Sequence, residues 1–258
     1  MTLDRAQTTR RVLTYEIVLV LLLSLGQSAV YAVVSLIAKL TAGKPLSQQA
    51  AVLNQSQSPR PYLDLTYQLL GIFFSLIPVA LALYLLARDH VGPRRTLGLT
   101  ADRPGFDVGF GALLAACIGI PGLALVYVAR LLGINAQIVP AALNDHWWTV
   151  PVLILAAIEN AVLEEVIVVG YLITRLRSLR LSTPWIIACS AVLRGSYHLY
   201  QGFGAFVGNA VLGVVFALFY MRFKRVMPLI IAHALIDTVA FVGYSLLKDQ
   251  SWLSWLLR

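Results

Sequence analysis

The chain has 258 residues, of which 59% are hydrophobic and 12% are charged, and its formal net charge is +8. Because soluble domains carry about 25% charged residues, this composition excludes an ordinary soluble protein and indicates an integral membrane protein. The positive charge does not indicate nucleic-acid binding, since the basic residues lie mostly at the ends of apolar runs, where they report membrane topology.

The N-terminal part contains three apolar runs close to or above the roughly 20 residues of a spanning helix. The first run is predicted to be a retained span, because it is too long for a signal-peptide core and lacks a clear small-residue cleavage site. The polar segments 41–61 and 133–146 are predicted to lie outside, and the arginine-rich segment 88–107 inside. The three predicted spans cover residues 12–40, 62–87 and 108–132.

The C-terminal part contains four further predicted spans, and an interfacial pair, Trp147 and Trp148, precedes them. The first of the four carries the adjacent glutamates of AIENAVLEEVIVVGY and continues into the basic segment TRLRSLR. The final residues, 248–258, are predicted to lie in the membrane interface, with Trp252 and Trp255 as anchors. The other three predicted spans cover residues 184–200, 205–220 and 228–247.

Seven spans predict an all-α, polytopic helix bundle in the cell membrane with the N-terminus inside. The bundle is divided into N-terminal spans and loops (1–147), a C-terminal helical core (148–247) and the interfacial tail (248–258). Charge supports the topology, because cytoplasmic loops carry an excess of lysine and arginine. The predicted inside segments hold 13 of the 20 basic residues: Arg5, Arg10, Arg11, Arg88, Arg94, Arg95, Arg103, Arg175, Arg177, Arg180, Arg222, Lys224 and Arg225.

Few strongly polar side chains lie at membrane depth, and most of them fall in the fourth, fifth and seventh predicted spans. Each charge at the centre of a spanning helix costs about 2.5–3.5 kcal/mol, so such residues are functional candidates by default. A rise of about 1.5 Å per residue places the polar groups of these three spans in one layer near mid-membrane. The whole set is Glu16, Glu159, Asn160, Glu164, Glu165, Arg194, His198, Asn209, His233 and Asp237.

The residue types in this layer fit two kinds of chemistry. Glu164 and Glu165 point about 100° apart on a helix, so they are predicted to do different jobs. His233 and Asp237 lie four residues apart and share one face of the seventh span. Carboxylates and imidazoles that converge in a cavity fit general-base hydrolysis of a carbonyl. The set Glu164, His198, His233 and Asp237 would equally bind a divalent metal such as zinc.

Three motifs in these spans resemble those of the CAAX prenyl protease and bacteriocin-processing family, also called CPBP or Abi. Glu164 and Glu165 match the glutamates of the family motif EExxxR. The histidine of the family motif FxxxH matches His198 in YHLYQG. The last motif, a histidine with a polar residue four positions later, matches His233 and Asp237 in PLIIAHALID.

The resemblance covers about residues 148–244 and implies intramembrane endoproteolysis in a catalytic helical core. It implies that Glu164 is the general base and that His198 helps to position the attacking water. His233 and Asp237 would hold the tetrahedral oxyanion. Members of the family are described both as metalloproteases and as metal-independent glutamate enzymes, so the resemblance leaves the cofactor open between a divalent metal and none.

Departures from the family motifs predict that a cation has moved between two helices. The arginine position of EExxxR is Val169, and the phenylalanine position of FxxxH is Arg194. Arginine is always charged and can grip a carboxylate with two parallel hydrogen bonds. We therefore predict that Arg194 pairs with Glu165, the remaining member of the candidate catalytic set, and leaves Glu164 free to act on water. Asp237 is a third departure, because a carboxylate donates no hydrogen bond unless it is protonated.

Three functions fit the sequence at this point. The favoured one is an intramembrane peptidase that acts on a peptide or protein with a membrane-associated segment, in contact with membrane lipid. The second is a non-catalytic immunity or scaffold protein on the same fold. The third is a proton-coupled transporter with the carboxylates as a relay, although the repeated halves common in transporters are not apparent. In each case Asn209 is predicted to support the bundle through an interhelical hydrogen bond.

Overall fold

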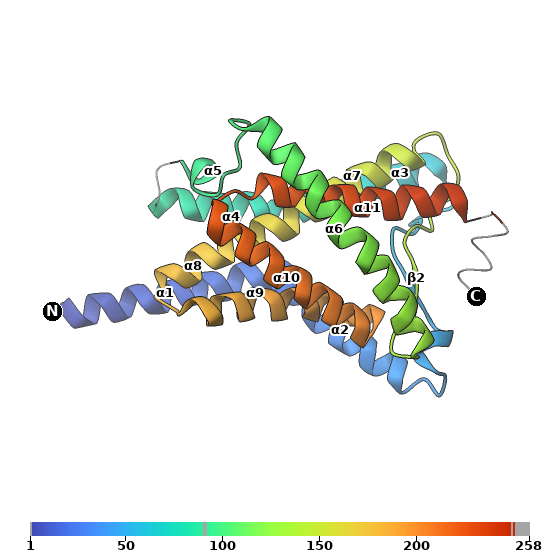
Figure 1. Cartoon of the computed structure of the whole chain (residues 1–258), viewed down its shortest axis with the longest axis horizontal. Helices are drawn as coiled ribbons and strands as arrows, with labels where there is room; N and C mark the ends of the chain where they lie inside the picture. The colour runs from blue at the N-terminus through green and yellow to red at the C-terminus, as the bar shows by residue number, and fades with distance from the viewer. Residues whose placement is uncertain (1, 90–91, 249, 251–258) are drawn as a thin grey trace.

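The computed structural model describes residues 2–89, 92–248 and 250 and confirms an all-α fold (Figure 1). Two short 3₁₀ helices are η1 (Leu46–Gln48) and η3 (Leu199–Gln201), and a π-helix is η2 (Glu165–Tyr171). The described strands are β1 (Ala50–Val52) and β2 (Gln137–Val139). The α-helices are α1 (Thr2–Leu22), α2 (Leu25–Leu40), α3 (Pro61–Ser75), α4 (Ile77–Asp89), α5 (Pro93–Thr96), α6 (Pro104–Leu131), α7 (Thr149–Glu164), α8 (Leu172–Ser178), α9 (Thr183–Tyr197), α10 (Phe203–Phe223) and α11 (Met227–Leu247).

Multiple helices are long and apolar enough to cross a membrane, so the chain is a multi-pass membrane protein. Four such segments are the α3–α4 stretch Pro61–Arg88, α6, α10 and α11, and the bent pair α1–α2 would make a fifth. The predicted count of seven spans is therefore not confirmed for the described residues. The difference arises at α7 and α9, which have only 16 and 15 residues. These two short helices carry four of the ten polar residues of the predicted layer, namely Glu159, Asn160, Glu164 and Arg194.

The first predicted span is broken into two helices, because the chain bends by 55° between α1 and α2. Two small residues at the break explain the bend. The Ser24 hydroxyl donates to the carbonyl of Val20 at 2.7 Å, which competes with the helical backbone pattern. Gly26 lies so close to the turn before it that a Cβ there would be 2.7 Å from the Leu21 carbonyl oxygen. The bend directs α2 against α9 and η3.

The two segments predicted to lie outside meet each other in the structure. β1 pairs with β2 in parallel, with Ala50 opposite Gln137 and Val52 opposite Val139. Figure 1 shows β2 and the end of α11 at one end of the molecule, and the start of α1 and α5 at the other. This arrangement agrees with a topology that places residues 41–61 and 133–146 on the same side. The predicted interfacial anchors Trp252 and Trp255 lie outside the described residues.

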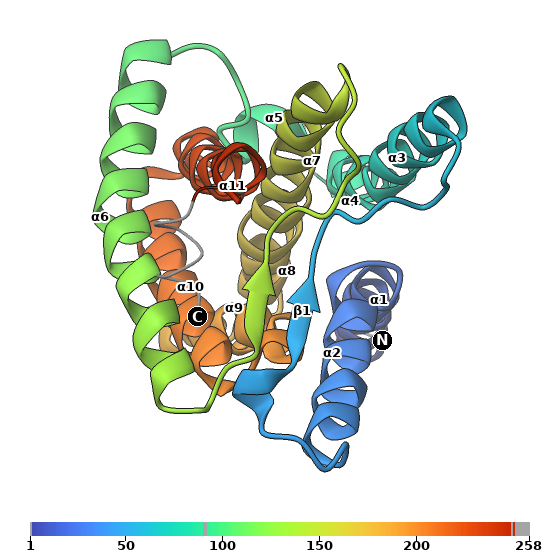
Figure 2. The same cartoon turned by 90° about the vertical axis from the view of Figure 1, so that its right-hand side faces the viewer.

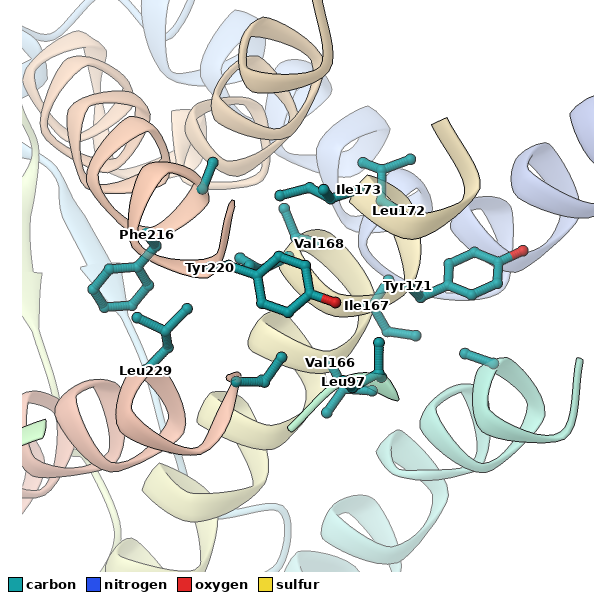
Figure 3. Packing of buried hydrophobic residues seen from close by; sticks show 14 of the residues in the cluster. Leu97, Val166, Ile167, Val168, Tyr171, Leu172, Ile173, Phe216, Tyr220 and Leu229 are labelled. Atoms are coloured by element: carbon teal, nitrogen blue, oxygen red, sulfur yellow. The ribbon is translucent and has the colours of Figure 1, made fainter. Parts of the chain in front are cut away.

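The π-helix η2 lies at the centre of the apolar core. Its residues Val166, Ile167, Val168 and Val169 are fully buried. Side chains from the α5–α6 segment, α10 and α11 pack around it in the same cluster, among them Leu97, Phe216 and Leu229 (Figure 3). Viewed along the bundle, α7 and α8 occupy the middle, with α11, α6 and α10 on one side and α1 to α4 on the other (Figure 2).

Candidate active site

The candidate site lies at the junction between α7 and η2, where Glu164 ends the α-helix and Glu165 begins the π-helix. Both residues are buried, with 8% and 0% of their surface exposed. π-helical turns are rare and frequently occur at functional sites. α9 and α11 pack against this junction and bring Arg194 and His233 to it.

Glu165 is held by two partners on the same carboxylate oxygen. Arg194 Nη2 donates to Glu165 Oε1 at 2.5 Å, and His233 Nδ1 lies 2.7 Å from that oxygen. The predicted pairing of Arg194 with Glu165 is therefore confirmed, but Arg194 also lies within ion-pair distance of Glu164 and does not leave it entirely free. The Arg194 guanidinium also lies over the ring of Phe216, with 5.2 Å from Cζ to the ring centroid. Glu165 is thus fixed between a permanent cation and an imidazole.

Glu164 has a different environment from its neighbour. The Tyr197 hydroxyl donates to Glu164 Oε2 at 2.7 Å, and Arg194 Nη1 lies 3.7 Å from the same oxygen. The other oxygen, Oε1, lies 3.9 Å from His198 Nε2. That separation is too long for a direct hydrogen bond and is of the kind that a single water can bridge. Glu164 therefore has one anchored oxygen and one oxygen directed to an imidazole.

His198 follows the last residue of α9 and is oriented by the turn after it. Gln201 Nε2 lies 3.5 Å from His198 Nδ1 and also donates to the Tyr200 hydroxyl at 2.8 Å. An amide N–H that donates to Nδ1 selects the tautomer with its proton on Nε2. In that tautomer, the N–H group of His198 faces Glu164.

The last predicted motif forms a short chain of polar contacts on α11. His233 Nε2 lies 3.5 Å from Asp237 Oδ2, as expected for residues four apart on one helix. Asn160 Nδ2 donates to the same Asp237 oxygen at 3.5 Å. His233 therefore has one ring nitrogen toward Glu165 and the other toward Asp237. Asp237 itself contacts α7 through Asn160.

Two polar residues of the predicted layer lie elsewhere. Glu16 on α1 accepts hydrogen bonds from Arg175 Nε at 2.7 Å and from the Tyr171 hydroxyl at 2.9 Å, and so joins α1 to α8. The prediction of an interhelical bond for Asn209 is wrong. Its amide donates to the carbonyl of Ala205 at 3.0 Å, one turn earlier on the same helix, because that carbonyl is within reach of a short amide side chain.

The sequence reasoning missed Tyr197 as a partner of the site and did not connect Asn160 to Asp237. A signal for Tyr197 existed, because it lies three residues after Arg194 and so on the same face of α9. It also directly precedes His198. No such spacing joins Asn160 to Asp237, which lie on different helices and meet only through the packing of α7 against α11.

Comparison with known proteins identifies the region that carries this geometry. Residues 146–239 match the family model described as type II CAAX prenyl endopeptidase Rce1-like. This region is similar to that family. The match confirms the resemblance to the CAAX prenyl protease and bacteriocin-processing family, which is a family of proteases. The matched region contains α7 to α10 and the first part of α11. It therefore includes every residue of the candidate active site described above. No curated protein and no solved structure matches the chain.

The fit of a divalent metal to this site can be tested on the side chains. The set whose ligand atoms lie within 4.8 Å of one another is Glu164, Glu165 and His233, so within the described residues it includes neither His198 nor Asp237 of the predicted set. Glu165 Oε2 is buried without a hydrogen-bond partner in the described part of the chain and could act as a ligand. Arg194, however, contacts both carboxylates of the set. A permanent cation in that position weakens the attraction of the two carboxylates for a second cation.

Tyr197 supplies the first testable prediction. Tyr197→Phe is expected to lower kcat of any peptide hydrolysis by about 10- to 100-fold, because a hydrogen bond to a charged group contributes about 1.5–3 kcal/mol. KM should stay close to wild type, and the thermal midpoint of unfolding should fall, because a buried carboxylate oxygen loses its donor. Steady-state kinetics would be compared with Tyr220→Phe, which removes a phenol hydroxyl bonded to Thr174 instead. Wild-type kcat in Tyr197→Phe would show that Tyr197 does not position Glu164.

Proposed function

We propose that this protein is a membrane-embedded endopeptidase of the cell membrane in which Glu164 activates water for attack on a peptide bond. The observation that carries the proposal is the unequal environment of the two adjacent glutamates. Arg194 and His233 lie 2.5 and 2.7 Å from Glu165 but 3.7 and 4.0 Å from Glu164 Oε2. The other oxygen of Glu164, Oε1, is directed toward His198. Such a division assigns electrostatic support to one carboxylate and proton transfer to the other.

In the proposed reaction, Glu164 Oε1 accepts a proton from a water that the Nε2–H group of His198 orients. The resulting hydroxide bonds to the carbonyl carbon of the peptide and forms a tetrahedral intermediate. The C–N bond then breaks, and Glu164 returns its proton to the departing amine. Water and the peptide thus become a carboxylic acid and an amine, and Glu164 ends as it began.

The surrounding residues serve to stabilise and orient the reacting groups. The negative charge on the intermediate forms in a buried site, where fixed donors stabilise it more strongly than water does. Both ring nitrogens of His233 face carboxylates, so His233 holds Glu165 in place, and Asp237 orients the His233 ring. Arg194 keeps Glu165 in place and supplies positive charge beside the intermediate.

The proposed substrate is a peptide or protein with a membrane-associated segment. The matched family is described as a CAAX prenyl endopeptidase, and on that likeness a prenylated C-terminus is the first substrate to test. A lipid-modified peptide would concentrate in the bilayer that surrounds the helices.

Reconstitution tests the proposal directly. Purified wild-type protein and Glu164→Ala would be placed in proteoliposomes with a peptide library that includes prenylated and unmodified C-termini, and products would be identified by mass spectrometry. We expect new fragments with wild type that are absent with Glu164→Ala. Failure of folded wild-type protein to cleave any member of the library would count against a peptidase and favour the scaffold alternative.

Metal dependence is a separate prediction. Among the described residues, one set could hold a metal: Glu164, Glu165 and His233. Because Arg194 contacts both carboxylates of this set, we expect hydrolysis to persist after treatment with strong chelators. Elemental analysis of the purified protein should give well under one equivalent of divalent metal, and Asp237→Ala should not change that content. About one equivalent of zinc, lost together with activity upon chelation, would contradict the metal-independent reaction.

A further inference from the structure

A second polar site lies away from the glutamates, between the α5–α6 segment and the turn that joins α10 to α11. It is a hollow of about 430 Å³ that one acidic and four basic side chains line, together with Gly98, Thr100 and Phe223. The acidic residue is Asp102, and Thr100 donates its hydroxyl hydrogen to Asp102 Oδ2 at 2.8 Å. The four cations are Arg95, Arg103, Lys224 and Arg225.

The wall of this hollow is a fixed structure. Arg225, which is only 8% exposed, donates from Nε and Nη2 to the two oxygens of Asp107 at 2.8 and 2.6 Å. Its Nη2 also donates to the Thr100 carbonyl at 2.9 Å. Gly98 allows the α5–α6 segment to approach the α10–α11 turn closely, because a Cβ at this position would be 2.5 Å from Arg225 Cα. Asp107 neutralises Arg225, and the other three cations remain in excess over Asp102.

These three cations are exposed, and the described residues give none of them an ion-pair partner. Lys224 is in the left-handed conformation, with φ of 55°, at the end of α10, where helices usually place glycine. Partial burial and the nearby Arg177 guanidinium lower the pKa of the Lys224 ammonium group. Lys224 lies over the Tyr220 ring, and a bound anion would offset its repulsion from Arg177.

We propose that this hollow binds a phosphate group, either on the headgroup of an anionic phospholipid or as free phosphate. Guanidinium groups match phosphate oxygens with paired hydrogen bonds, and lysine adds a point charge. The volume falls within the roughly 300–1,000 Å³ of small-ligand sites. Figure 1 shows α5, the start of α6 and the α10–α11 turn toward the end of the molecule that the charge pattern predicts to be cytoplasmic. Basic pockets between helices on that side of a membrane suit acidic headgroups.

The test compares two triple variants of the full chain that each remove three positive charges. The pocket variant is Arg95→Gln, Arg103→Gln and Lys224→Gly. The control variant is Arg11→Gln, Arg94→Gln and Arg180→Gly, at exposed residues that do not line the hollow. The two glycine substitutions match, because Arg180 is also left-handed, with φ of 59°. Glycine relieves that conformation, so neither variant is expected to unfold for backbone reasons.

Binding would be measured by calorimetry in neutral detergent with dioctanoyl phosphatidic acid, dioctanoyl phosphatidylcholine and inorganic phosphate as probes. We expect the pocket variant to bind phosphatidic acid about 100-fold more weakly, at a factor of about five for each charge, and the control variant to bind as wild type does. Binding of phosphatidic acid without inorganic phosphate would identify a lipid headgroup site. Comparable binding of inorganic phosphate would identify a free-phosphate site. Equal losses in the two variants, or no binding of either anion, would overturn the proposal.

Discussion

Replacing Glu164 with glutamine is expected to abolish peptide hydrolysis and leave the protein folded. Glutamine retains an oxygen that can accept the hydrogen bond of Tyr197, but it cannot take a proton from water. Loss of a general base lowers rates by about 100- to 10,000-fold. Cleavage of a substrate peptide in proteoliposomes would measure the rate, and the thermal midpoint in detergent would report folding.

Glu165→Gln provides the matched control on the adjacent residue. It removes the same charge from the partner of Arg194 and His233. We expect it to lower the thermal midpoint as well as activity, because Arg194 would lose its close ionic partner in a fully buried position. Full activity in Glu164→Gln would refute the general-base assignment. A stability loss in Glu164→Gln as large as in Glu165→Gln would show that the two glutamates do not differ in role.

Replacing Arg194 with phenylalanine is expected to destabilise the protein by about 3–5 kcal/mol, because it leaves a buried carboxylate without its charged partner. Hydrolysis should fall as well, since Arg194 contacts both glutamates. Denaturant unfolding in detergent would measure the free energy, and peptide cleavage the activity. Arg94→Phe, the same substitution at an exposed residue of α5, controls for the effect of the new aromatic side chain.

Adding Val169→Arg to Arg194→Phe tests whether the cation can return from the other helix. Residue 169 lies one turn after Glu165, within reach of its carboxylate. Val169 is fully buried in the core, so the larger side chain must displace apolar neighbours and rescue should be partial. We expect the double variant to regain part of the lost stability and activity. A double variant no better than Arg194→Phe, or wild-type stability in Arg194→Phe, would contradict the exchange of the cation between helices.

Several features followed from the sequence for simple physical reasons. The membrane class follows from composition, because a chain so poor in charge cannot cover a soluble surface. Burial of the glutamates at membrane depth demands a cation, and the unusual position of Arg194 in its motif identifies that cation. The spacing of His233 and Asp237 likewise placed both on one helix face.

Other features depended on how the helices pack. The sequence did not predict the break between α1 and α2, the π-helix that begins at Glu165, or the pairing of β1 with β2. The contacts of Glu164 with Tyr197 and of Asp237 with Asn160 were also missed, as was the set of residues whose ligand atoms lie close enough to bind a metal. Each of these depends on the rotation and depth of one segment relative to another, and hydrophobic periodicity within a segment carries no information about that relation.

The sequence by itself thus determined which residues are polar inside the membrane and which charges must be neutralised there, because the cost of an unpaired charge is a local property of each residue. Only the tertiary structure decided which oxygen faces which donor. It anchors one oxygen of Glu164 on Tyr197 and directs the other to His198, and it places Arg194 against both glutamates. These assignments depend on distances between carboxylate oxygens and their donors that differ by about an ångström. Only the packing of α7, α9 and α11 sets such distances.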